Sequence, residues 1–284
     1  MSGIATEDDG MTKDAAAMSA PSAGSLPLDQ IICGDNCEVM RQMPSESIDL
    51  VVTSPPYDDL RTYGGHSWDF YGVAWNLKRL LKPGGVIVWN VSDATIRGSE
   101  TGSSMRQALH FQDVGLGLHD TMIWQKSRPT PQEQHPRYQP SWEYMVVLCK
   151  GYPPKTFNGI REPSVHAGKP VRIKGHRKKD DSFRHPVPKD AVIGRTRLRR
   201  NVWSIANGGV DGHPAAFPEA LARDHILSWS NPGDVVLDPF SGSGTTAKMA
   251  RETGRRFIGI EVNPEYVEIS RKRLAQQALP MDVA

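Results

Sequence analysis

The stretch Thr53-Ser54-Pro55-Pro56-Tyr57 combines three groups that can hold a planar molecule. It follows Ile48-Asp49-Leu50-Val51-Val52, an apolar, β-branched run typical of a buried parallel strand. Neither proline has an N–H to continue a strand ladder, so the strand ends in a fixed loop. Ser54 supplies a hydroxyl, Pro55 a carbonyl and Tyr57 a flat ring. Two acceptors beside a ring suit a group with an exocyclic NH2, such as a flipped-out base. A Pro-Pro turn with a packing tyrosine has the same sequence.

A glycine-rich turn near the other end of the chain has the features of a nucleotide-binding loop. The run Val235-Val236-Leu237 predicts a strand that leads into Asp238-Pro239-Phe240-Ser241-Gly242-Ser243-Gly244-Thr245-Thr246. A predicted helix follows, and the next predicted strand ends in Glu261. The glycines let the backbone approach a ligand closely, and the acidic residue can accept both ribose hydroxyls.

Two cofactor classes compete for this loop. The glycine spacing, with Glu261 about 20 residues further on, also fits the dinucleotide fingerprint. A P-loop is excluded because no Lys-Ser/Thr pair follows the glycines. The carboxylate of Asp238 suits a cationic sulfonium better than a pyrophosphate, and the 23 residues after Glu261 are too few to complete a dinucleotide fold. We therefore predict S-adenosyl-L-methionine as the cofactor, with the missing strands upstream in a circularly permuted sheet.

Short apolar runs alternate with amphipathic segments, which predicts a parallel α/β sheet. Strands are expected at 30–33, 48–52, 86–89, 119–125, 143–149, 235–237 and 257–260, and helices at 36–43, 68–81, 105–114, 218–229, 247–253 and 264–276. We expect residues 82–85 to close the second helix, 93–104 to form a mobile loop, and the strands at 119–125 and 143–149 to pair antiparallel. Ligands bind at the carboxyl ends of strands where the strand order reverses, so strands 48–52 and 235–237 should be neighbours.

Composition narrows the class of protein. A chain of 284 residues with 38% hydrophobic content permits one large α/β domain with an insertion, or two small domains. The longest apolar runs are strand-sized, which predicts no membrane span. Acidic residues at positions 7–9 argue against a signal peptide, and three cysteines without such a signal predict a cytoplasmic protein. No Cys or His spacing matches a metal site, so no metal is expected.

Basic charge is concentrated in one internal segment. Residues 150–200 carry 15 Lys and Arg against 4 Asp and Glu, whereas the whole chain has a net charge of +2. The densest clusters consist of Lys174, Arg177, Lys178, Lys179, Arg195, Arg197, Arg199 and Arg200. Such clustering is typical of polyanion binding, although a solvated loop has the same composition. Core-forming sequence flanks the segment on both sides, which favours an insertion that holds nucleic acid.

The order of these features resembles the β class of DNA amino-methyltransferases, whose catalytic motif is written Asp/Asn/Ser-Pro-Pro-Tyr. The similarity covers roughly residues 28–275. It implies a circularly permuted, Rossmann-like class I methyltransferase fold, double-stranded DNA as substrate, a place in restriction-modification, and often a homodimer. The implied divisions are a disordered tail at 1–27, a catalytic half at 28–149, a target-recognition insertion at 150–212, a cofactor-binding half at 213–276 and a tail at 277–284.

The resemblance also implies roles for the cofactor-loop residues. Asp238, Phe240, Ser241, Gly242, Gly244 and Thr245 would surround the methionine end of the cofactor, with Pro239, Ser243 and Thr246 in the same loop. Glu261 would hold the ribose, and Asp35 would accept from the adenine amino group. His213 and Phe217 belong to a motif that covers the methionine. Asp35 also fits a helix cap, and Phe217 and Phe240 also fit plain core positions.

On the base side, the resemblance implies that Tyr57 stacks on the flipped base. Ser54 and the Pro55 carbonyl would accept from its NH2, with Pro56 fixing the loop. By the same resemblance, serine in the first motif position favours cytosine and aspartate is usual for adenine. Serine also occurs in adenine enzymes of this class, so both N4 of cytosine and N6 of adenine stay open. Tyr138 and Trp142, in the loop at 126–142, are candidate pocket walls.

Two other functional classes remain as alternatives. One is a DNA-binding protein that has kept the fold but lost activity, which the intact motifs argue against. The other is a methyltransferase acting on RNA or protein glutamine, which usually shows Asn-Pro-Pro-Tyr in unpermuted order.

Overall fold

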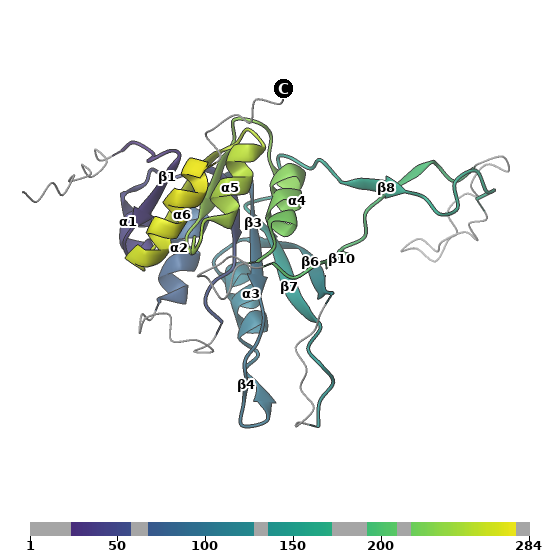
Figure 1. Ribbon diagram of the computed structural model, residues 1–284, viewed down its shortest axis with the longest axis horizontal. Coiled ribbons are helices and arrows are strands. Elements are labelled where there is room, and N and C mark those ends of the chain that lie inside the picture. Colours follow the sequence, from purple (N-terminus) through teal and green to yellow (C-terminus); the bar gives the residue numbers. More distant parts are fainter. Residues whose placement is uncertain (1–23, 58–67, 128–135, 172–191, 209–216, 277–284) are drawn as a thin grey trace, which may run out of the picture.

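The computed structural model describes residues 24–57, 68–127, 136–171, 192–208 and 217–276. Its centre is an eight-stranded sheet (Figure 1). In spatial order the strands are β1 (Gln30–Cys33), β12 (Arg256–Glu261), β11 (Val235–Asp238), β2 (Ile48–Thr53), β3 (Leu81–Val91), β7 (Trp142–Cys149), β6 (Gly117–Lys126) and β10 (Val202–Ile205). The first five run parallel, β7 is antiparallel to both its neighbours, and β10 pairs parallel with β6.

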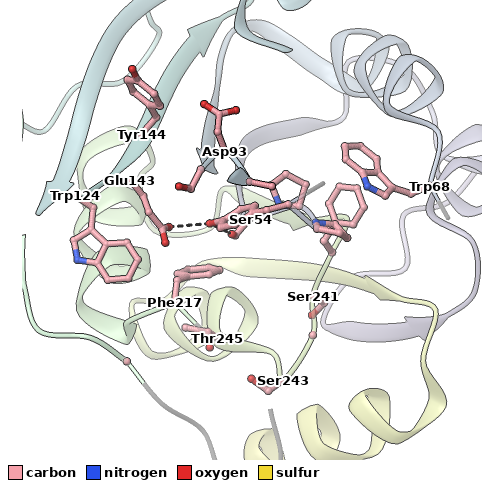
Figure 2. Close-up of a pocket in the computed structure, with 18 of the residues that line it drawn as sticks. Ser54, Trp68, Asp93, Trp124, Glu143, Tyr144, Phe217, Ser241, Ser243 and Thr245 are labelled. Atoms are coloured by element: carbon pink, nitrogen blue, oxygen red, sulfur yellow. Dashed lines mark hydrogen bonds between the residues drawn. The ribbon is translucent and has the colours of Figure 1, made fainter. Parts of the chain in front are cut away.

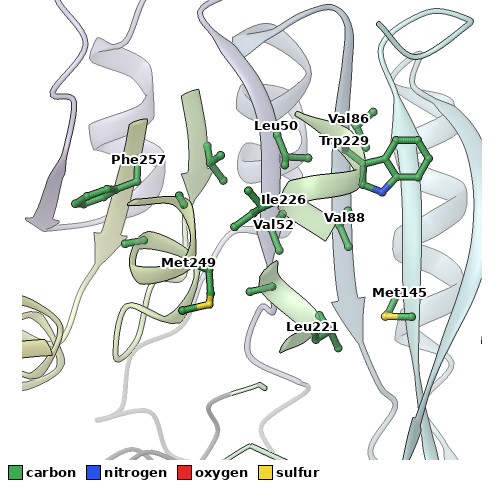
Figure 3. Close-up of a cluster of buried hydrophobic side chains, with 14 of the residues drawn as sticks. Leu50, Val52, Val86, Val88, Met145, Leu221, Ile226, Trp229, Met249 and Phe257 are labelled. Carbon is green, nitrogen blue, oxygen red and sulfur yellow. The ribbon is translucent and has the colours of Figure 1, made fainter. Parts of the chain in front are cut away.

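Helices cover both faces of the sheet. One hydrophobic cluster joins the sheet to α1 (Asn36–Gln42), α2 (Phe70–Leu80) and α3 (Ser103–Asp113). The other joins it to α4 (Glu219–Trp229), α5 (Thr245–Glu252) and α6 (Pro264–Gln276). Figure 3 shows this second cluster, in which Leu50 and Val52 of β2 face Leu221 and Ile226 of α4. Burial on both sides explains why the central strands β2 and β11 are mostly apolar along their whole length rather than alternating.

The strand that precedes the Ser-Pro-Pro-Tyr loop lies in the middle of the sheet. β2 is buried along its whole length, with β11 on one side and β3 on the other. The predicted adjacency of strands 48–52 and 235–237 is therefore confirmed. It places the two motif-bearing loops at the same edge, where the strand order reverses.

Two sequence expectations about local structure were wrong. Residues 82–85 belong to β3 instead of closing α2, because Gly84 N donates to Lys150 O at 2.7 Å and Lys150 N donates to Gly85 O at 3.0 Å. These bonds extend the ladder past the proline and glycines. The loop expected at 93–104 contains a short hairpin of β4 (Thr95–Ile96) and β5 (Ser99–Glu100). The antiparallel pairing of β6 and β7 is as predicted.

The basic segment leaves the sheet as an arm (Figure 1). Within it, β8 (Arg161–Pro163) pairs antiparallel with β9 (Thr196–Leu198). The chain then returns as β10, an edge strand of the main sheet inside the range 150–212. Lys174, Arg177, Lys178 and Lys179 lie outside the described residues, as does His213. So do the tails at 1–23 and 277–284.

Among the residues that the structure describes, no helix is long and apolar enough to span a bilayer.

Candidate active site

A cavity of about 950 Å³ opens at the carboxyl ends of β11 and β2 (Figure 2). Both sequence motifs line it. The first contributes Ser54, Pro55, Pro56 and Tyr57, and the second contributes Pro239, Phe240, Ser241, Gly242, Ser243 and Thr245. Asp35, Phe217 and Glu261, which were also predicted as site residues, lie on its wall as well. The fold therefore brings together two groups of residues that lie far apart in the sequence.

Three predicted residues support the loop from behind and are not part of the cavity wall. Gly244 has a φ of +78°, and a Cβ there would lie 2.9 Å from Ser270 Oγ of α6, so glycine permits this close helix packing. Thr246 Oγ1 donates to the Val52 carbonyl at 3.0 Å, which ties α5 to β2. The third, Asp238, links the two motif-bearing strands.

Asp238 is the last residue of β11 and is buried. Its Oδ1 accepts from Thr53 Oγ1 at 2.6 Å and from Phe240 N at 3.1 Å. Its Oδ2 is buried and has no hydrogen-bond partner within the described ranges. Burial raises the pKa of this carboxyl from 3.8 to about 6. The nearby donors of Thr53, Phe240 and Thr246 oppose the rise, and the charge of Glu261 adds to it. The carboxylate expected to face the ligand is instead embedded behind the loop.

The cofactor side of the cavity is rich in acceptors. Glu261 Oε2 accepts from Gly242 N at 2.8 Å, and its Oε1 accepts from Asn263 N at 2.8 Å. Asp35 caps α1 by accepting from Glu38 N at 2.9 Å and also lines the cavity. Ser241 Oγ is buried without a hydrogen-bond partner in the described part of the chain. Unsatisfied oxygens beside an acidic strand end fit a ligand that carries an amino group and ribose hydroxyls, as S-adenosyl-L-methionine does.

The base side of the cavity holds a hydrogen-bond network. Ser54 Oγ lies 2.8 Å from Tyr57 Oη, and Tyr57 Oη donates to Glu143 Oε2 at 2.8 Å. Asn90 Nδ2 donates to Tyr57 Oη at 2.9 Å and to Glu143 Oε2 at 2.8 Å. Lys126 Nζ pairs with Glu143 Oε1 at 2.6 Å. Figure 2 shows Ser54 and Glu143 facing each other across this part of the cavity.

Sequence analysis missed Asn90, Lys126 and Glu143 as site residues. The available signal was a polar residue at the end of an otherwise apolar strand, as in Val-Ile-Val-Trp-Asn90 and Glu143-Tyr-Met-Val-Val-Leu. That signal does not show that two such residues contact each other, because the contact depends on the register in which β3 and β7 pair.

Several aromatic residues also line the cavity. Tyr138 and Trp142, the predicted candidates, line the cavity together with Trp124 and Tyr144. Arg137 binds Glu100 at 3.3 Å and so joins the β4–β5 hairpin to the segment that precedes β7. These two segments border the mouth of the cavity.

The described basic residues of the arm differ in their surroundings. Arg199 pairs with Asp224 of α4 at 2.5 Å and lies 4.4 Å from the Trp203 ring centroid, which anchors the arm to the core. Arg197 pairs with Glu162 across the β8–β9 ladder at 2.7 Å. Arg195 and Arg200 are exposed. The described residues contain no group of three or more His, Cys, Asp or Glu that could hold a metal ion.

Comparison with known proteins identifies the family. A family model described as DNA methylase, of the N6/N4 type, matches residues 48–272. The chain belongs to the N6/N4 DNA methylase family. Over 238 residues it is 49% identical to the orphan methyltransferase M.BamHII of Bacillus amyloliquefaciens, covering 80% of this chain and 89% of that protein. It is 30% identical to the type II methyltransferase M.SmaI of Serratia marcescens, covering 87% and 91%.

Solved structures agree with this assignment. A Thermus thermophilus protein described as a DNA modification methylase, crystallised with S-adenosyl-L-methionine, matches with a TM-score of 0.61 and 27% identity over 89% of this chain and 97% of its own. The cytosine-N4-specific PvuII DNA methyltransferase shares the fold, with a TM-score of 0.65 and 23% identity over 93% and 89%. The predicted class I sheet is therefore confirmed, and the chain is a DNA methyltransferase that uses S-adenosyl-L-methionine.

Proposed function

We propose that this chain methylates the exocyclic amine of a flipped-out cytosine or adenine at a specific site in double-stranded DNA. The observation that supports this is the convergence of the two motifs on one cavity. The Ser54 hydroxyl lies on one side of it and the Ser241–Thr245 loop on the other. An amine held by the first group faces a cofactor held by the second.

The protein's part in the reaction is positioning and polarisation. A base inside a duplex cannot reach this cavity, so it must leave the stack at a cost of a few kcal/mol. The Tyr57 ring stacks on it, while Ser54 Oγ and the Pro55 carbonyl accept from its NH2. Both acceptors draw the nitrogen lone pair out of the ring plane and towards the cofactor side. S-adenosyl-L-methionine supplies the electrophilic methyl group.

The cofactor is held by the acidic and small residues of the opposite side. Glu261 accepts from the ribose hydroxyls and Asp35 from the adenine amino group. Ser241, Gly242, Ser243 and Thr245 surround the methionine end, with Asp238 behind them, while Phe217 and Phe240 cover it.

Replacing Glu261 with Ala should weaken S-adenosyl-L-methionine binding by at least about tenfold, because hydrogen bonds to a charged group are each worth about 1.5–3 kcal/mol. Titration calorimetry measures the effect. Glu268→Ala, which removes an exposed carboxylate from α6, serves as the matched control and should bind normally. Tight NAD binding by the wild-type protein, without a response to S-adenosyl-L-methionine, would contradict the cofactor assignment.

The arm at 150–200 is proposed to contact the DNA backbone. Among the described arginines of the arm, Arg195 and Arg200 are the best candidates for phosphate contacts because both are exposed. Arg199, by contrast, is paired with Asp224. Arg195→Glu combined with Arg200→Glu should lower the log–log salt slope of DNA binding by about 0.9 for each lost phosphate contact. Lys272→Glu on α6 is the control. An unchanged slope would mean that these arginines do not contact DNA.

The decisive experiment for the function is product analysis. Purified protein is incubated with plasmid DNA and S-adenosyl-L-methionine. The DNA is then digested to nucleosides, whose masses are determined by mass spectrometry. N4-methylcytosine or N6-methyladenine is expected, and sequencing of the same DNA locates the site. Of the two products, the serine at position 54 favours N4-methylcytosine. The absence of any methylated nucleoside would favour an inactive DNA-binding protein, and 5-methylcytosine would refute the mechanism.

The cellular setting is a further part of the proposal. The thiols of Cys33, Cys37 and Cys149 are all free, which fits a reducing cytoplasm.

A homodimer is supported by large exposed apolar side chains on adjoining helices, Tyr71 and Trp75 of α2 and Leu109 of α3. Sedimentation at micromolar concentration distinguishes a dimer from a monomer.

A further inference from the structure

Consecutive polar contacts link Lys126 to Glu143, Glu143 to Tyr57, and Tyr57 to Ser54. The Ser54 hydroxyl is the last group of this chain and lies at the cavity. We propose that Glu143 is a positioning residue that fixes the direction of these hydrogen bonds, so that Ser54 presents only acceptor lone pairs to the target base. The site would then select bases that carry an amino group over bases that carry a carbonyl group at the same position. This inference rests on the proposed function, because it concerns the base that Ser54 contacts.

Glu143 starts the chain because its carboxylate can only accept. Its side chain is 8% exposed, and the ammonium of Lys126 lies 2.6 Å from Oε1. Oε2 has two donors, the Tyr57 hydroxyl at 2.8 Å and Asn90 Nδ2 at 2.8 Å. A carboxylate has no proton to return, so the single hydroxyl proton of Tyr57 must point towards Glu143.

Asn90 reinforces that direction. Its Nδ2 also donates to Tyr57 Oη, at 2.9 Å. Turning the amide round would place Asn90 Oδ1 against the carboxylate of Glu143, so the amide keeps its donors on this side. Tyr57 Oη has thus committed its only proton and already accepts from Asn90.

The consequence falls on Ser54. Its Oγ lies 2.8 Å from Tyr57 Oη, and distance alone allows either hydroxyl to donate. With the tyrosine proton directed to Glu143, Ser54 has to donate and Tyr57 has to accept. The remaining lone pairs of Ser54 Oγ are then acceptors, which match an NH2 group and repel a carbonyl oxygen. A mismatch of this kind leaves a buried polar group unpaired, which disfavours the wrong base by about tenfold to a hundredfold.

Glu143→Gln tests this directly. A glutamine can donate to Tyr57 as well as accept, so the tyrosine proton becomes free to turn towards Ser54. The Ser54 hydroxyl can then point its own proton into the cavity. The variant keeps the size of the side chain but no longer fixes the direction of the hydrogen bonds made by the Tyr57 and Ser54 hydroxyls.

The measurement is binding of labelled duplexes by fluorescence anisotropy in the presence of S-adenosylhomocysteine. The duplexes contain the recognition site found by product analysis, with the target base either intact or replaced by its carbonyl counterpart, uracil for cytosine or hypoxanthine for adenine. Each duplex has its own pairing energy, which is the same for every protein variant. It therefore cancels when the amino-to-carbonyl preference of a variant is divided by that of the wild type.

The amino-to-carbonyl preference of Glu143→Gln, divided by that of the wild type, is expected to be about one tenth or less, because the variant no longer disfavours the carbonyl base. Methyl transfer by Glu143→Gln should fall by about a hundredfold, with cofactor affinity unchanged. The matched control is Asp49→Asn. Asp49 is also a buried carboxylate paired with a lysine, with its Oδ2 2.6 Å from Lys82 Nζ, but it lies at the opposite end of β2. It should keep the full preference.

A second variant makes the test independent of the stability of Glu143→Gln. Tyr57→Phe removes the oxygen that receives the Ser54 proton and leaves the Lys126–Glu143 pair in place. It should lose the preference to the same extent.

A preference retained in either Glu143→Gln or Tyr57→Phe overturns the inference, and so does an equal loss in Asp49→Asn. If the wild type forms no methylated nucleoside, the proposed function fails before this inference is reached. If the wild type is active and the preference survives these changes, only the inference fails.

Discussion

Replacing Ser54 with Ala should reduce methyl transfer by about a hundredfold or more, while the cofactor still binds with its normal affinity. The hydroxyl lies on the base side of the cavity, within 2.8 Å of Tyr57 and apart from the loop that is proposed to hold the cofactor. Removing one polar group aimed at a reacting centre typically costs a factor of about 10² to 10³ in rate. Tritiated-methyl transfer measures the rate, and calorimetry measures cofactor affinity.

Ser204→Ala is a suitable control for this change. Ser204 is an exposed serine of β10 whose hydroxyl donates to Gln125 Oε1 at 2.9 Å, outside the cavity. It should retain full activity. Tyr57→Ala should lose at least as much activity as Ser54→Ala, because it removes both the ring and the partner of Ser54. Full activity in Ser54→Ala would rule out the proposed role of the hydroxyl.

The parts of the fold that sequence predicted well depend on local signals. The buried strand at 48–52 is predicted by a run of five residues that contains a single charged side chain. Two prolines that cannot extend a strand ladder follow soon after it. The cofactor strand is marked by the glycines that follow it. Both signals are contained in a few residues, and the general rule for ligand sites in open sheets then predicts that the two loops meet.

The parts that sequence did not predict depend on long-range packing. Glu143 reaches Tyr57 only because β7 pairs antiparallel with β3 in the register that sets Met145 opposite Asn90, which brings Glu143 within a hydrogen bond of Asn90. A one-residue change in that register would direct Glu143 to the other face of the sheet. Likewise, counting basic residues could not separate Arg199 from Arg200, because the partner Asp224 lies on a helix that follows the arm.

Asp238 shows both the value and the limit of the motif. An acidic residue at the start of a cofactor loop was expected to face the ligand, yet its Oδ1 is bound by Thr53 and Phe240 N. This arrangement joins the ends of β11 and β2, so the residue sets the spacing of the two loops.

Asp238 should make the ligand-free protein less stable as pH rises from about 4 to about 6. Its carboxyl has a pKa of about 6 in the folded protein, against an ordinary value of 3.8. Below the lower value both states are protonated and the group carries no penalty. Between the two values the unfolded chain releases its proton first, which favours unfolding, and above about 6 the penalty is complete. A difference of about two pKa units corresponds to a change on the order of 3 kcal/mol in the free energy of unfolding.

Asp238→Asn isolates this contribution, since asparagine keeps an oxygen for Thr53 and Phe240 N but does not ionise in this range. Urea unfolding of both proteins between about pH 4 and pH 7.5 should give a difference curve that favours the wild type at the acid end and the variant at the neutral end. Because the neighbouring charge is that of Glu261, Glu261→Gln should reduce the size of the step without abolishing it. A flat difference curve would show that Asp238 ionises normally and that its burial does not control the stability of the two loops.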